Sequence, residues 1–167
     1  MTTATPTKTR LAPGLHGSVL SRILEEGYGA GAWHGPDLES AVADVTPAQA
    51  FRRPGPGRHN IAEIALHHAF YARSVVERLT GQAPKPFIVE GEDWFDLEAK
   101  TGPAWPKVRD TLATWQRTLV KVVADLGAGR IESPLSEAER FDLVLGITCH
   151  AVYHAGQMQL VKKLITG

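Results

Sequence analysis

The amino-acid sequence predicts an all-α fold, a bundle of four amphipathic helices. Apolar residues recur at helical spacing in four segments, glycines and prolines separate these segments, and only the short stretch 86–91 has the composition of a strand. The long connection between the second and third helices predicts a crossover within the bundle. Periodicity alone leaves open whether those two helices run parallel or antiparallel.

The first helix is expected from Leu15 onward, because apolar residues recur every three or four positions until the glycines that begin at Gly27. Residues 1–14 are rich in Thr and Pro and show no periodicity. We expect them to form a flexible tail that precedes a single domain at 15–167.

The second long helix is expected to follow a short helix and a loop. The short helix begins near Pro36, and the loop at 52–59 contains two prolines and two glycines. Asn60 and Glu63 have the spacing of a capping box, which predicts the start of the long helix. Gly81 suits its C-terminal end.

The second half of the chain predicts two further helices. The connection 82–103 is longer than most loops in compact domains. Pro106 suits the first turn of the third helix. Ser136 and Glu139 form a second capping box, which predicts the fourth helix at roughly 137–165.

Composition and charge exclude several classes of protein. Lys and Arg number 18, as do Asp and Glu, so the formal net charge is zero, which argues against a protein that neutralises nucleic-acid phosphates. No apolar run is long enough for a membrane span, the first residues lack the core of a secretory signal, and the single cysteine, Cys149, excludes an intrachain disulfide. We therefore expect a cytoplasmic protein with neither a nucleic-acid nor a membrane partner.

Two of the seven histidines, His150 and His154, are four residues apart in the expected fourth helix. This spacing places both imidazoles on one helix face, where they can bind one metal ion. The same face carries apolar residues and Gln157, so burial of the two rings is unfavourable unless they have partners. A shared metal ion or a buried hydrogen-bond network would supply them. Ala151 follows the first histidine where a zinc protease needs a glutamate, which argues against that class.

The second helix offers two candidates for a third ligand, His67 and His68. Neighbouring side chains on a helix point about 100° apart, so the two rings cannot share a face. The His67 stripe is partly polar and the His68 stripe mostly apolar, and periodicity does not choose between them. Glu63, one turn before His67, is a candidate for proton transfer or for orienting a ligand, and Gln157 is a candidate for orienting an imidazole.

Three stretches of the chain resemble a known family. The stretch GITCHAVYHAGQMQLVKKL (146–164) resembles the last helix of the DinB (DinB/YfiT-like) family, in which a histidine and three residues precede His-Ala-Gly-Gln. Residues 60–81 resemble the second helix of that family, and 32–61 look like its first connection, with a tryptophan and a Pro-Gly-Pro-Gly turn. The likeness covers roughly 15–165.

This resemblance implies a four-helix bundle whose helices run up, down, down and up, and which forms a homodimer. It also implies a divalent metal ion held by His67, His150 and His154. Members of the family often have Asp directly after the first histidine of the fourth-helix pair. The chain has Ala151 there, so we expect no acid–base role at that position and no loss of a ligand.

A three-histidine centre is typical of catalytic metal sites. Three neutral imidazoles leave the cation its full charge and an open position for water, whose pKa falls toward about 7, or for a low-molecular-weight thiol. Proteins similar to the family include thiol-dependent transferases and isomerases that use mycothiol, bacillithiol or glutathione. We expect a thiol-dependent transferase or a hydrolase with zinc or nickel, the alternative being a non-catalytic structural or binding module stabilised by metal. The loops 82–103 and 127–136 are expected to frame its pocket.

Overall fold

The chain is all-helical in the computed structural model, which describes residues 16–29 and 32–167 and side chains from residue 19 onward. The expected tail at 1–14 lies outside the described residues. The described part forms six helices and no strand, which confirms the all-α prediction, and the strand candidate 86–91 is irregular. In chain order the helices are α1 (His16–Gly27), α2 (Leu38–Ala43), α3 (Pro47–Ala50), α4 (Ile61–Thr80), α5 (Trp105–Gly127) and α6 (Glu137–Thr166).

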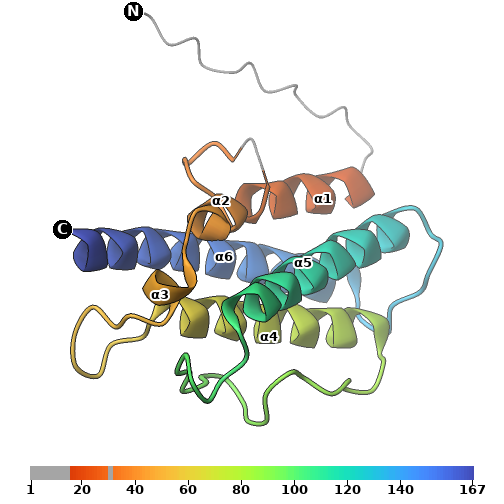
Figure 1. The fold of residues 1–167 in the computed structure, drawn as a ribbon. Coiled ribbons are helices and arrows are strands. Elements are labelled where there is room, and N and C mark those ends of the chain that lie inside the picture. The colour runs from red at the N-terminus through yellow and green to blue at the C-terminus, as the bar shows by residue number, and fades with distance from the viewer. Residues whose placement is uncertain (1–15, 30–31) are drawn as a thin grey trace, which may run out of the picture.

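The four longer helices lie side by side (Figure 1). α4 packs against α5 and α6, and α1 packs against the same two helices, while the short α2 lies against α6. Apolar side chains from these helices form two buried clusters, one around Leu66 and Met158 and the other around Leu79 and Leu119. Along α6, the residues of the second cluster end at Ile147 and those of the first begin at Ala151, so His150 lies where the two clusters meet.

The helix ends follow from local hydrogen bonds that the sequence predicts. The Asn60 side chain accepts from the amide of Glu63, whose carboxylate accepts from the amide of Asn60, so the predicted capping box starts α4. Ser136 and Glu139 start α6 in the same way. The single-turn α3 was not expected, although Thr46 caps it in a third box of this kind.

The connection between α4 and α5 is attached to the beginning of α4. The Asn60 side-chain amide donates to the carbonyl of Leu97 at 2.9 Å, and the amide of Leu97 donates to the Glu63 carboxylate at 2.9 Å. Leu97 itself is buried. These contacts hold the connection across α4 and place Asp93 and Trp94 next to the histidines of that helix.

Candidate metal centre

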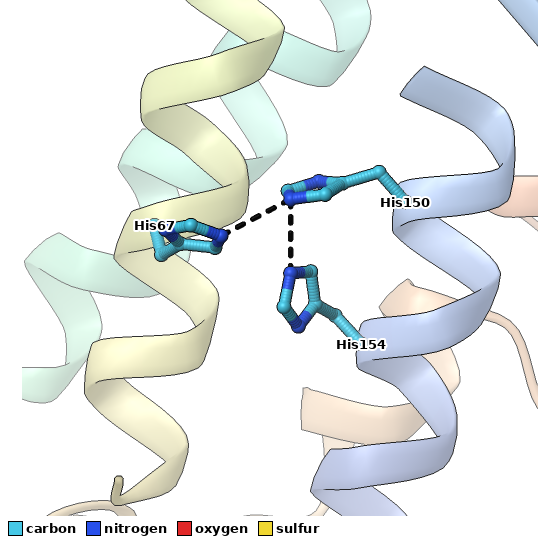
Figure 2. Close-up of side chains that lie close together, drawn as sticks. All are labelled: His67, His150 and His154. Carbon is cyan, nitrogen blue, oxygen red and sulfur yellow. Dashed lines mark hydrogen bonds between the residues drawn. The ribbon is translucent and has the colours of Figure 1, made fainter. Parts of the chain in front are cut away.

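α4 and α6 bring His67, His150 and His154 together, with the three rings directed toward one another (Figure 2). One ring nitrogen from each histidine lies within 4.8 Å of the other two. Nε2 of His150 is 3.1 Å from Nε2 of His67 and 3.0 Å from Nε2 of His154. His150 and His154 are one helical turn apart on α6, so the spacing in the sequence explains their shared direction.

The remaining ring nitrogens of two of these histidines contact oxygen acceptors. Nδ1 of His67 lies 2.9 Å from the carbonyl oxygen of Asp93, and Nδ1 of His154 lies 2.6 Å from Oε1 of Gln157. Because these oxygens only accept hydrogen bonds, each Nδ1 carries the proton. In each neutral ring, Nε2 therefore has a free lone pair, and both lone pairs are directed toward the centre of the group.

This donor set fits a divalent cation. A neutral His150 ring has one N–H, and the lone pairs on Nε2 of both His67 and His154 approach its Nε2. One N–H cannot donate fully to both of these lone pairs. A cation at the meeting point would satisfy all three Nε2 atoms at once, and imidazole nitrogens are ligands that zinc and nickel accept. The three histidines can therefore hold one metal ion.

Burial keeps the three imidazoles neutral. It lowers the pKa of His150 to about 3 and that of His154 to about 4, and it also lowers the pKa of His67. Repulsion from the neighbouring rings lowers the pKa of His150 further, whereas the hydrogen bonds to Gln157 and Asp93 act in the opposite direction on the other two. Near neutral pH the nitrogen lone pairs remain available for a metal.

Asp93 and Trp94 hold the ring of His67 in place. Asp93 has a φ of 64°, a left-handed conformation that few residues other than glycine adopt, and its carbonyl contacts Nδ1 of His67. The indole of Trp94 stacks on His67 at 3.8 Å between ring centroids and, at the same distance, on His59. Both residues belong to an irregular segment, so no periodicity in the sequence indicates this role.

The two residues considered as orienting or proton-transfer groups have different surroundings. Gln157 contacts His154 directly. The buried Glu63 carboxylate instead accepts from the amides of Asn60 and Leu97 and contacts the side chains of Arg53 and His59. Although burial raises the pKa of Glu63, these hydrogen bonds outweigh it and hold the pKa below its ordinary value.

Position 151 faces the end of α1. Ala151 is buried, and a β-carbon added at Gly27 would lie 2.8 Å from the β-carbon of Ala151. An aspartate at 151 would therefore meet the end of α1. This close approach accounts for a small residue at position 151.

A hollow of about 740 Å³ lies beside Trp94 and Gln157, the contacts of His67 and His154, and none of the three converging histidines lines it. Trp94 and Gln157, which contact two of the rings, line it together with His59 and apolar residues of α6 such as Leu160. Residues 54–59 form its other wall. The expectation that 127–136 frames this pocket was therefore wrong, because that loop lies beyond the opposite end of α5 (Figure 1).

The fold and the histidine group define an all-α protein with a candidate metal centre between two helices. Residues 32–158, more than half of the chain, match the model of the DinB superfamily, and all three histidines lie within the match. The chain belongs to the DinB superfamily. No curated protein and no solved structure matches it. Among the described helices, none combines the length and hydropathy needed to cross a membrane.

The pKa values predict that the metal-free protein loses stability as the pH falls from about 7 to about 5. Unfolded histidines protonate near pH 6.5, whereas His150 and His154 stay neutral in the fold, so the unfolded state binds more protons in this range. Each such histidine costs up to about 1.4 kcal/mol per pH unit. Urea unfolding after chelation measures the change.

A double variant, His150→Gln with His154→Gln, should flatten this pH dependence. His34→Gln, at an exposed position, controls for the loss of a histidine as such. An identical slope in the double variant and the wild type would contradict the assignment.

Proposed function

We propose that the chain is a metal-dependent enzyme in which His67, His150 and His154 hold one divalent ion, zinc or nickel. The observation that carries this proposal is the convergence of three neutral Nε2 atoms from α4 and α6. Three protein ligands leave a coordination position open, in contrast to the four ligands of closed structural zinc sites.

The chemistry that we propose is thiol-dependent transfer or hydrolysis. When bound, such a cation lowers the pKa of a coordinated thiol or water and makes either one nucleophilic at neutral pH. The thiols that fit are of low molecular weight, such as mycothiol, bacillithiol or glutathione. The hollow beside Trp94 has a volume typical of small-molecule sites and supports this proposal.

The chain's own residues would orient the ligands and shield the site. Asp93 and Trp94 hold His67, and Gln157 holds His154 through Nδ1. Such partners fix the tautomer and the direction of ligating imidazoles. The contacts of Glu63 support a role in holding the connection 81–104 to α4, and Gln157 is the better candidate for acting on the site.

We also propose that the fold is a four-helix bundle with a crossover, in which α1, α4, α5 and α6 run up, down, down and up. The long 81–104 connection and the packing of α4 against α5 support this topology. In Figure 1, α4 and α5 both begin at the side where α3 lies, and α6 runs in the opposite direction.

The proposed metal site predicts about one equivalent of bound metal in protein purified without a nickel resin. Each of the variants His67→Ala, His150→Ala and His154→Ala should reduce the content to less than about a tenth, because two imidazoles bind far more weakly than three. Elemental analysis by mass spectrometry measures the content. His34→Ala should retain the metal, and full retention by His154→Ala would refute the site.

Turnover distinguishes the proposed enzyme from a structural module. The position of the ligands on both α4 and α6 favours the module as the second candidate, since a cation there would tie the two helices together. The enzyme should catalyse metal-dependent conjugation of a thiol to a model electrophile, or hydrolysis of a model ester, well above the rate of the His154→Ala variant. A large loss of melting temperature on chelation, with no turnover by either assay, would favour the structural module.

We propose that the protein acts in the cytoplasm as a homodimer. Several large exposed apolar side chains of α6 lie on one face, within about 140° of one another around the helix axis. Such a face supports self-association through this helix. These side chains are Phe141, Leu145, Tyr153, Leu160 and Leu164. Sedimentation equilibrium should give twice the chain mass, and the double variant Phe141→Glu, Leu145→Glu should give the monomer. A monomeric wild type would contradict the proposal.

A further inference from the structure

His68 contacts the histidine group from inside the core. It is fully buried, and its Nδ1 lies 3.0 Å from Nδ1 of His150. The two rings lie nearly parallel, with centroids 5.2 Å apart. His68 is not one of the three histidines whose nitrogens converge, so its contact is with the far side of the His150 ring.

Two polar atoms beside His68 are buried without a hydrogen bond to any described residue. They are Nε2 of His68 itself and Oε1 of Gln116 on α5. The Gln116 side chain nevertheless lies close enough to raise the pKa of His68, against the larger lowering by burial. A hydrogen bond between the two side chains would pair a donor with an acceptor, and buried polar atoms are rarely left unpaired.

The ring nitrogen that carries the proton in His150 determines which ring nitrogen carries the proton in His68. For His150 to bind a cation through Nε2, its proton must be on Nδ1, and the acceptor that the described structure places at that atom is Nδ1 of His68. His68 then carries its own proton on Nε2, and the neighbouring Gln116 side chain offers Oε1 as an acceptor. One assignment of tautomers therefore gives each of these buried atoms a partner.

The reverse assignment works against metal binding. If Nδ1 of His68 donated to His150, the proton of neutral His150 would be on Nε2, where it would block the lone pair that a cation needs. It would also leave the bare Nε2 of His68 and Oε1 of Gln116 as two acceptors, neither of which can donate to the other.

We propose that a hydrogen-bond chain from His150 through His68 to Gln116 orients His150 as a metal ligand, with His68 as a positioning residue. The chain connects α6, α4 and α5. With it, the outer nitrogen of each ligating imidazole has an acceptor: Asp93 for His67, Gln157 for His154 and His68 for His150. The inference rests on the proposed function, because it concerns the metal affinity of the same site.

The experiment compares two substitutions at one position. His68→Leu keeps apolar volume and removes the acceptor, whereas His68→Asn retains an oxygen acceptor near the position of Nδ1. Zinc dissociation constants, measured by competition with a chromophoric chelator, should rise about 10- to 100-fold in His68→Leu and less than about threefold in His68→Asn. Metal-free His68→Leu should also melt at a lower temperature than the wild type, because it leaves the Nδ1 proton of His150 and Oε1 of Gln116 without partners.

The outcomes separate this inference from the proposed function. If wild-type protein binds no zinc, the proposed function fails and this inference fails with it. If wild-type protein binds zinc and His68→Leu binds it equally well, only the inference fails. If zinc affinity falls equally in His68→Leu and His68→Asn, packing at position 68 matters rather than the acceptor, and the inference also fails. Should His68→Leu not fold, nitrogen NMR of zinc-loaded wild type decides: protons on Nδ1 of His150 and Nε2 of His68 support the chain, and the reverse overturns it.

Discussion

The structure depends on one constraint: the nitrogens of three neutral imidazoles, two of them buried and one half-buried, converge between α4 and α6. Such an arrangement is unfavourable unless something satisfies the lone pairs, because a buried polar atom without a partner loses its hydrogen bonds to water. Two of the rings are held with their protons turned outward, toward the Asp93 carbonyl and the Gln157 side chain. The group therefore presents lone pairs that a single cation at its centre would satisfy together.

The surrounding scaffold holds the rings in this geometry. The 81–104 connection reaches His67 because Asn60 and Glu63, the residues that begin α4, also bind the backbone of Leu97. A single set of polar side chains thus starts the helix and fixes the loop that covers it. Trp94 both stacks on His67 and lines the adjoining hollow.

Local sequence patterns predicted the parts of the fold that depend on neighbours in the chain. Capping boxes at Asn60 and Ser136 located the starts of α4 and α6, and the i, i+4 spacing placed two histidines on one face. The periodicity of the sequence could not predict whether His67 or His68 joins the other two histidines, because both are buried. Only the packing of α4 against α6 decides which ring nitrogen reaches the centre of the group. The part played by Asp93 was not predictable, because it depends on a loop conformation with positive φ.

The most direct test of the account is the structure of the protein crystallised with zinc, with anomalous scattering measured at the zinc edge. The account predicts one strong peak between α4 and α6, about 2.0–2.1 Å from Nε2 of His67, His150 and His154. A peak bound by other residues, or the absence of a peak at this position in crystals that contain zinc elsewhere, would contradict it.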